Sequence, residues 1–371
     1  MRSLTRRTLS AFTFLIAISV VVPATAATRH RPEVALVANP GSNNVSVYTV
    51  QTNGSLLQVS GSPFAAGGSP NSVAIVPSGR FAYVADVIPG GVTGFSVAES
   101  GVLTPIPGSP FAAPTGTAFV TTDPSGRFLY ALNCGADCSG SGAGSIAAYT
   151  IDQGTGALTS IAGSPFTAGE WPYSLAVDPT GQFAYVANFG SGDVYSFSID
   201  SQSGVLTQIG VPIAAGSHPI SVVVDPWSQF VYAANTGSSN VSAFSINFDG
   251  TLSSVAGSPF FAGEFTSGIA ASTNGQFVVV SAGPGAFVYS IGATGALSLV
   301  AGSPYAAGTG PTGVSVDPTD NIVYVVNGAS NNVSAYSFND SSGKLTPVKG
   351  SPFPAGASAA SIATAPAPFH Q

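Results

Sequence analysis

The sequence predicts an all-β fold, a seven-bladed β-propeller built from four-stranded antiparallel blades. Three observations predict it. A unit of 45 to 55 residues is repeated about seven times, each unit contains four short apolar runs separated by turn residues, and the two chain ends carry complementary parts of one further unit. A period in the forties with four strands per repeat is typical of a propeller, whereas solenoids usually have shorter repeats or helices.

The repeat is clearest between Gly163 and Ile209. Its apolar runs are short, rich in β-branched and aromatic residues, and bounded by Gly, Pro, Asn, Asp and Ser, which is typical of strands. A turn follows the first run at Asp178-Pro179-Thr180-Gly181, where Pro sets φ and Gly accepts a positive φ. The four predicted strands are Ser174–Val177, Gln182–Ala187, Val194–Ile199 and Gly204–Ile209.

A Gly-Ser-Pro-Phe motif marks the spacing of the repeats. It begins at Gly61, Gly108, Gly163, Gly257 and Gly350, and varied forms begin at Gly210 and Gly302. Successive motifs are 47, 55, 47, 47, 45 and 48 residues apart. Since the repeat spans nearly the whole chain, we expect one domain over residues 28–371, with an ordered body over about 33–365.

The ends of the chain complete the predicted ring. Before the first motif lie three predicted strands, Val34–Ala38, Val45–Val50 and Ser55–Val59. After the last motif lies one more, Ala359–Thr364, of the type that opens each repeat. Three strands and one strand make a complete blade, so the sequence predicts a composite blade that leaves no free sheet edge at the seam.

Residues 1–27 have the pattern of a secretory signal peptide. Arg2, Arg6 and Arg7 precede an apolar run over Leu9–Val22, and Ala24-Thr25-Ala26 forms a small-residue cleavage site. We therefore expect an exported protein, periplasmic or extracellular, with no stable membrane insertion after the signal is removed. The alternative is an uncleaved anchor, although the apolar run is short for a bilayer span of about 20 residues.

The composition restricts the partners of this protein. Only 7% of the residues are charged, and the formal net charge is -7. An acidic surface without basic stretches argues against binding to nucleic acid or to anionic membranes. We expect a monomer without a cofactor or a metal, whose partner is a small sugar-like ligand or an envelope protein or glycan.

The two cysteines, Cys134 and Cys138, lie close together in the longest repeat. In an exported chain this spacing predicts a disulfide that closes an enlarged loop. A metal site is the alternative, but two thiols without a nearby histidine are too few ligands for a closed zinc site.

Candidate chemistry gathers in three consecutive links between repeats. His30 and His370 lie in the tails, so His218 is the histidine of the folded body, and Glu170 and Glu264 lie in the links before and after it. Equivalent links of a propeller meet around the mouth of the central channel, which predicts a cluster with His218 as acid or base and a glutamate orienting it. Ring side chains in the same links are the predicted ligand contacts: Trp171, Tyr173 and Phe265. The alternative is that all six are solvated link residues.

Two further sets of recurring residues predict structural roles. Asn or Asp ends the second strand of most repeats, which indicates turn capping by the side chain, at Asn39, Asp86, Asn133, Asn188, Asn235 and Asn327. An aromatic residue occurs once in each third strand, which indicates packing between blades, at Tyr48, Phe95, Tyr149, Phe197, Phe244, Tyr289 and Tyr336.

The segment Tyr185-Val186-Ala187-Asn188 and its counterparts resemble YVTN-type propeller repeats, and the body resembles the seven-bladed lactonase family, which includes bacterial 6-phosphogluconolactonases. The resemblance implies a lactone site at the channel mouth. Lactonase-like members carry Pro-His-x-His ahead of a first strand; His218 matches the first histidine, and Ile220 stands at the second. The arginines of the body, Arg80 and Arg127, are expected on the opposite face.

Two functions follow as hypotheses. The scarcity of catalytic residues favours an exported propeller that serves as a rigid binding or interaction module through its channel-mouth loops. The alternative is a lactonase-like hydrolase of the 6-phosphogluconolactonase family that acts on a sugar lactone, with His218 as its base or acid.

Overall fold

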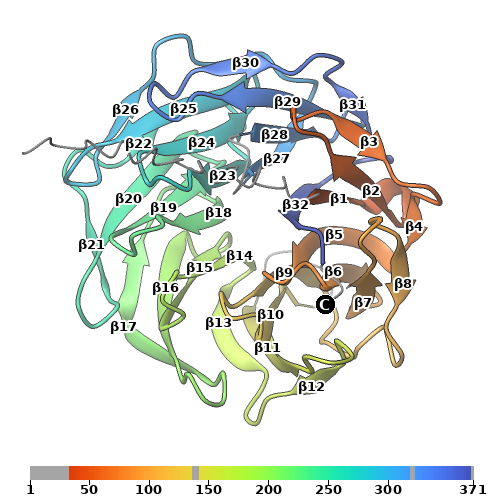
Figure 1. Cartoon of the computed structure of the whole chain (residues 1–371). Coiled ribbons are helices and arrows are strands. Elements are labelled where there is room, and N and C mark those ends of the chain that lie inside the picture. Colours follow the sequence, from red (N-terminus) through yellow and green to blue (C-terminus); the bar gives the residue numbers. More distant parts are fainter. Residues whose placement is uncertain (1–32, 136–141, 318–321, 369–371) are drawn as a thin grey trace, which may run out of the picture. The chain divides into compact units, whose positions relative to one another are not determined.

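The computed structural model describes residues 33–135, 142–317 and 322–368. Within these residues the body, Arg31–Gln371, forms seven antiparallel sheets arranged in a ring, as Figure 1 shows. We number the sheets as blades 1 to 7 in the order in which the chain enters them. The predicted all-β, seven-bladed propeller is confirmed.

Blade 1 is built from both ends of the chain, as predicted. Its strands, from the inner to the outer side, are β32 (Ser361–Pro366), β1 (Glu33–Asn39), β2 (Asn44–Val50) and β3 (Leu56–Gln58), with β4 (Phe64–Ala65) also on β2 and a short 3₁₀ helix, η1 (Pro40–Ser42), between β1 and β2. The register runs from Glu33 opposite Pro366 to Ala38 opposite Ser361. This pairing closes the ring, because it covers the inner edge of β1.

The other blades each run from the inner to the outer side in chain order. Blade 2 contains β5 (Gly68–Ile75), β6 (Phe81–Ile88), β7 (Gly91–Val97) and β8 (Leu103–Pro105). Blade 3 contains β9 (Thr117–Thr122), β10 (Phe128–Asn133), β11 (Ala143–Ile151), β12 (Leu158–Ser160) and β13 (Phe166–Glu170). Blade 4 contains β14 (Pro172–Val177), β15 (Phe183–Asn188), β16 (Asp193–Ile199) and β17 (Leu206–Ala214).

The last three blades follow the same plan. Blade 5 contains β18 (Pro219–Val224), β19 (Phe230–Asn235), β20 (Asn240–Ile246), β21 (Leu252–Ser254) and β22 (Phe260–Phe261). Blade 6 contains β23 (Gly268–Ala271), β24 (Phe277–Ala282), β25 (Gly285–Ile291) and β26 (Leu297–Leu299). Blade 7 contains β27 (Pro311–Val316), β28 (Ile322–Asn327), β29 (Asn332–Phe338), β30 (Leu345–Pro347) and β31 (Phe353–Pro354).

The Gly-Ser-Pro motif fastens the outer strand to the third strand in six blades. In each of them the motif's serine Oγ accepts a hydrogen bond from a third-strand amide; these serines are Ser62, Ser109, Ser164, Ser258, Ser303 and Ser351. Blade 4 has Val211 at this position, so the hydroxyl is missing. There β17 continues to Ala214, and its register on β16 shifts between Val194 and Ser196.

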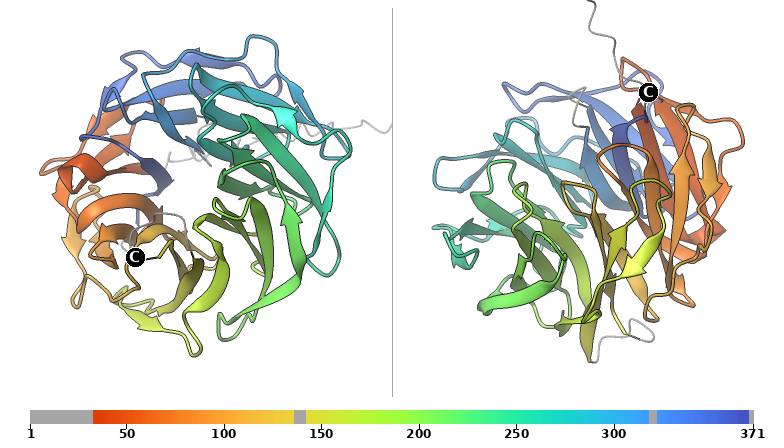
Figure 2. Two further views of the ribbon diagram at one scale, coloured as in Figure 1. Left: turned by 180° about the vertical axis from the view of Figure 1, so that it is seen from behind. Right: turned by 60° about the horizontal axis from the view of Figure 1, so that its bottom comes forward.

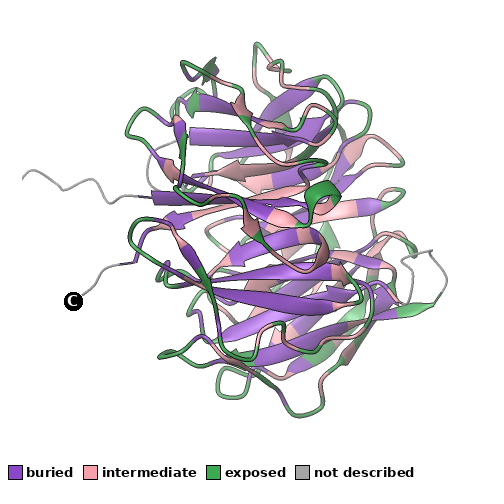
Figure 3. Ribbon diagram, turned by 90° about the vertical axis from the view of Figure 1, so that its right-hand side faces the viewer, coloured by how far each residue is buried: buried purple, intermediate pink, exposed green. Residues whose placement is uncertain are grey.

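The core lies between neighbouring blades. Figure 3 shows buried residues along the strands and exposed residues in the loops. The third-strand aromatics are buried, as predicted, and each apolar cluster draws on two adjacent blades. Because the blades share their core, none of them buries its apolar faces alone.

The predicted turn-capping residues are buried as well. Asn188, for example, donates from Nδ2 to Asp193 Oδ1 at 2.8 Å, and Asn39, Asn235 and Asn327 make the same contact with the residue five positions later. The predicted capping role is confirmed for these four asparagines, whereas Asn133 donates to Ala131 and Ser145, and Asp86 accepts from Thr93.

The seven inner strands surround a central cavity of about 520 Å³, at the opening visible in Figure 2. Its wall comes from β5, β9, β14, β18, β23, β27 and β32 and from residues directly before them. The cavity is therefore shaped by the same residues that begin each blade.

Several predictions fall outside the described residues: the signal peptide over residues 1–27, His30, Cys138 and His370. In the part of the chain that the structure describes, no helix combines the length and the apolar character needed to cross a bilayer.

Candidate functional site

The links that enter the inner strands lie on the face that also carries the turns between the second and third strands; we call it the upper face. Each link has a residue with a left-handed backbone at an equivalent position, just before the inner strand or at its start. The seven residues, with φ between 50° and 80°, are Ser69, Gly116, Trp171, His218, Phe265, Gly310 and Ser358.

Blades 4, 5 and 6 place large rings at this position, as Trp171, His218 and Phe265. A left-handed backbone costs a residue other than glycine about 1–2 kcal/mol. Trp171 carries a second cost, because its indole Nε1 is buried with no hydrogen-bond partner in the described part of the chain. Costs of this kind concentrate at functional sites, so we take these three rings as the candidate site and call them the rim rings.

Phe189 packs against two of the rim rings, tilted by 53° to the Trp171 ring and stacked on the His218 ring; we call these three rings the stack. Phe189 follows Asn188 in the turn between β15 and β16, and its ring centroid lies 4.6 Å from that of Trp171 and 4.4 Å from that of His218. The His218 and Phe189 rings are nearly parallel, with an interplanar angle of 13°. Sequence reasoning missed Phe189. The sequence did contain a signal for it, because Phe189 is aromatic whereas the equivalent residues of the other blades are not. Those residues are Pro40, Val87, Cys134, Thr236, Gly283 and Gly328.

Glycines support the two rim rings beyond Trp171. A Cβ atom placed on Gly237 would lie 2.6 Å from His218 Nδ1, and one placed on Gly283 would lie 3.4 Å from Phe265 Cδ2. Both glycines belong to the turn that follows the second strand of the same blade. The absence of a side chain at Gly237 therefore makes the room that the imidazole occupies.

The predicted carboxylates do not contact the imidazole. Glu170 and Glu264 are exposed, and neither forms an ion pair with His218 among the residues that the structure describes. Burial raises the pKa of Tyr195, and the negative charges of Asp193 and Glu170 add to that effect. The catalytic role of these three residues stays a prediction.

Tyr173 connects the rim rings with the cavity. It lies two residues after Trp171, lines the cavity, and has its ring centroid 6.0 Å from that of Phe189. Burial raises its pKa, and hydrogen bonding with the Asn71 side chain partly offsets that effect. Asn71 belongs to blade 2 and also lines the cavity.

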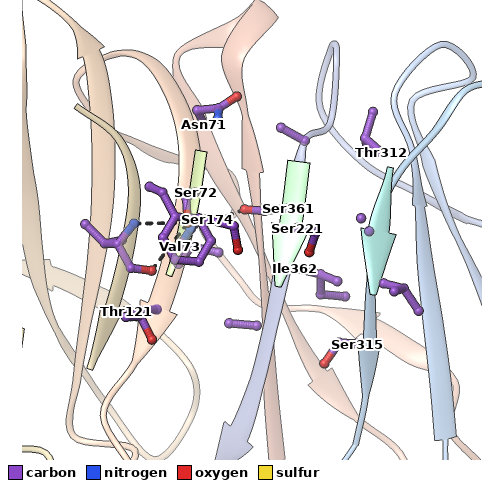
Figure 4. A pocket seen from close by; sticks show the side chains of 18 of the residues that line it. Asn71, Ser72, Val73, Thr121, Ser174, Ser221, Thr312, Ser315, Ser361 and Ile362 are labelled. Atoms are coloured by element: carbon purple, nitrogen blue, oxygen red, sulfur yellow. Dashed lines mark hydrogen bonds between the residues drawn. The ribbon is translucent and has the colours of Figure 1, made fainter. Parts of the chain in front are cut away.

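The cavity wall combines hydroxyl-bearing and apolar side chains. Figure 4 shows side chains of the inner strands around it, many of them serine or threonine. Four serines also fasten adjacent inner strands, because Ser72, Ser174, Ser221 and Ser361 each accept from a backbone amide of the next blade. The lining contains no Asp, Glu, Lys, Arg or His.

Positive charge lies away from this site. Arg80 Nη1 donates to the carbonyl of Gln153 at 2.9 Å, and Arg127 donates to the carbonyl of Ser201, both at turns on the face opposite the rim rings. Lys344 lies between β29 and β30, and Lys349 follows β30. These four are the lysine and arginine side chains within the described ranges, and none of them belongs to the links that carry the rim rings.

The remaining sequence predictions for the site concern metals and the cysteines. Within residues 33–135, 142–317 and 322–368, no group of three or more His, Cys, Asp or Glu side chains is arranged to hold a metal ion. Cys134 follows β10, and its predicted disulfide partner, Cys138, lies outside the described residues, so that disulfide stays a prediction.

Comparison with known proteins identifies the family. A family model described as lactonase, 7-bladed beta-propeller, matches residues 26–223, 189–258 and 256–359. The chain belongs to this family. The resemblance of the sequence to the lactonase family is therefore confirmed over most of the body.

Individual relatives of this lactonase propeller are distant. A 6-phosphogluconolactonase of Formosa agariphila is 40% identical over 65 residues, which is 18% of each protein. A putative 6-phosphogluconolactonase from Bacteroides uniformis has 16% identity, with a TM-score of 0.75 over 90% of this chain and 100% of its own. A periplasmic gluconolactonase of Pseudomonas aeruginosa has 17% identity and a TM-score of 0.74, over 91% and 99%. At these identities the solved structures support the fold.

Proposed function

We propose that this lactonase-family propeller binds an uncharged sugar lactone at the Trp171, Phe189 and His218 rings and hydrolyses it. The observation that carries the proposal is the Trp171, Phe189 and His218 stack, with centroid separations of 4.6 and 4.4 Å, at the mouth of the central cavity. The stack combines a surface for binding a ring-shaped ligand with the one imidazole of the described body. Family membership favours hydrolysis over binding alone.

The surroundings of the stack favour a neutral ligand. The apolar C–H face of a sugar ring packs on aromatic rings, and the sugar hydroxyls pair with the hydroxyls and backbone groups of the cavity wall. A phosphorylated lactone needs cationic partners, and the basic side chains of the described residues lie elsewhere. The proposed substrate is therefore a lactone without phosphate or carboxylate groups.

In the proposed reaction His218 acts as a general base. A neutral imidazole accepts a proton from water while the water oxygen attacks the lactone carbonyl. The ring C–O bond then breaks, and the leaving alkoxide receives the proton, so that water is added and a hydroxy acid is released. Exposure of His218 gives this water direct access.

A second candidate is the rigid binding module, in which the same rim holds a glycan or an envelope protein without changing it. The observation that favours it is the lack of any ion pair between His218 and the described carboxylates, because a catalytic imidazole is usually oriented by a third group. With the predicted signal peptide, both candidates act outside the cytoplasm.

The test is turnover of lactones by the purified mature chain. Glucono-1,5-lactone and galactono-1,4-lactone serve as neutral substrates, and 6-phosphogluconolactone serves as the charged one. We expect turnover of a neutral lactone, a loss of about 100-fold or more in His218→Ala, and slower turnover of the phosphorylated lactone. Phe248→Ala is the control, because Phe248 is fully exposed in a turn on the opposite face and should leave turnover unchanged.

The outcomes separate the two candidates. No turnover above the uncatalysed rate with any lactone would reject the hydrolase. Saturable binding of a neutral lactone without turnover, weakened by His218→Ala, would establish the binding module in its place.

A further inference from the structure

We propose that the rim holds an extended, neutral oligosaccharide across blades 4, 5 and 6, with Phe265 as a subsite beyond the stack. This inference rests on the proposed function only in taking the same rim as the ligand site. It adds a substrate class, a glycan chain rather than a single sugar ring, and it assigns Phe265 a binding role that is separate from the chemistry.

The rim rings follow the circumference of the cavity mouth. Trp171, His218 and Phe265 share one backbone conformation, with φ of 50°, 54° and 54°, in consecutive blades. The residues two positions later, Tyr173, Ile220 and Ser267, all line the cavity. Equivalent residues in consecutive blades of a ring are displaced along its circumference, so the three rings form an arc.

One sugar ring would use only part of this arc. The Trp171 and His218 rings each contact Phe189, but Phe265 lies one blade further along. Phe265 is 74% exposed and makes no ring contact within the described ranges. An exposed phenylalanine on a costly left-handed backbone does little for stability, which favours a role in holding a ligand.

The negative charges along the arc indicate which kind of chain-like ligand can bind there. Glu170 precedes Trp171, Glu264 precedes Phe265, and both are exposed. Their carboxylates accept hydrogen bonds from sugar hydroxyls but repel uronic acids and phosphorylated chains. The occupant that fits is an uncharged polyhydroxylated chain, and a protein partner is the competing outcome of the test below.

The experiment is calorimetric titration with β-1,4-linked glucose oligomers and β-1,4-linked N-acetylglucosamine oligomers, each from the monosaccharide to the hexasaccharide. In the wild-type protein we expect affinity to rise with chain length in at least one series. In Phe265→Ala we expect a loss of about threefold to tenfold for the longest oligomer and no change for the monosaccharide. Phe248→Ala, which removes the same side chain from the opposite face, should match the wild type.

A second variant controls for the possibility that Phe265→Ala fails to fold. Phe265→Gly suits the left-handed backbone better than alanine does, so it should fold at least as well and show the same loss for long oligomers. Affinity that does not depend on length, equal losses on short and long oligomers, or no binding in either series would overturn the inference, the last result favouring a protein partner.

Turnover of glucono-1,5-lactone by the same proteins separates this inference from the proposed function. Lactone turnover that is intact in Phe265→Ala, together with no dependence of binding on length, would reject the extended ligand alone. Length-dependent binding with no turnover in the wild type would reject the hydrolase and leave the extended ligand in place.

Discussion

At the residue scale, position 86 differs from its equivalents in the other blades. Five blades place a buried asparagine there, whose amide donates to neighbouring oxygens. Asp86 has no amide hydrogens; Thr93 Oγ1 donates to its Oδ2 at 2.6 Å, and its Oδ1 is buried with no hydrogen-bond partner among the described residues. Burial raises the pKa of Asp86 to about 6.

We expect Asp86→Asn to stabilise the protein at neutral pH. Folding raises the pKa of the Asp86 carboxyl, so its protonated form contributes to the stability of the folded protein at low pH. This contribution is lost as the pH rises through about 6, where the buried carboxyl ionises. The variant should therefore gain on the order of 2 kcal/mol at about pH 7.5 and much less at about pH 4.5. Denaturant unfolding at both pH values measures this. A gain that is the same at both values would contradict the assignment.

At the scale of elements, tyrosines of the second strands link five of the seven blades to the next blade. Their hydroxyls donate to the carbonyl of a turn glycine in the following blade: Tyr83 to Gly156, Tyr130 to Gly204, Tyr185 to Gly250, Tyr232 to Gly295 and Tyr324 to Gly54. Blades 1 and 6 have Leu36 and Val279 at this position, so this link is missing there. The chain thus builds five of its seven junctions with the same polar contact.

Tyr185→Phe should destabilise the protein by about 1–3 kcal/mol, because it removes a buried donor and leaves the Gly250 carbonyl without this partner. The matched control is Tyr305→Phe, whose hydroxyl makes a long, exposed contact of 3.4 Å with the carbonyl of Ala301. We expect a loss below about 0.5 kcal/mol there. Equal losses in the two variants, measured by denaturant unfolding, would argue against the role of this contact.

At the scale of the whole body, stability depends on closing the ring. The pairing of β1 with β32 joins the two ends of the described chain, and Glu33 lies opposite Pro366. Without β32, the inner edge of β1 and its buried neighbours would face solvent. Closure therefore matters more than the order in which the blades are connected.

A circular permutant tests this directly. Joining Pro368 to Glu33 through a short glycine linker, with new termini at Phe248, keeps every strand pair and places the break in an exposed turn. We expect it to unfold cooperatively within about 1–2 kcal/mol of the chain that begins at residue 33. A chain that ends at residue 356 lacks β32 and should aggregate or unfold at much lower denaturant. If both variants were equally stable, closure by β32 would not be important.

The sequence predicted which residues occupy equivalent positions in the ring, but not which side chains contact one another there. Equal spacing of the links placed Trp171, His218 and Phe265 at equivalent points of a ring, and the structure gives them the same φ. Phe189 was missed because it follows a second strand, about 20 residues from Trp171 and 30 from His218 along the chain. Its contact with Trp171 forms when β14 and β15 of blade 4 pair, and its contact with His218 exists only once blades 4 and 5 are packed together.

The sequence by itself determined the number of blades, their four strands and the closure by both ends, because turn residues and apolar runs act locally and recur at a regular spacing. Only the tertiary structure decided that Phe189 and His218 stack and that neither Glu170 nor Glu264 forms an ion pair with His218. Local patterns decide which residues turn or extend, whereas the direction of a side chain on an exposed link depends on the neighbours that the ring brings to it.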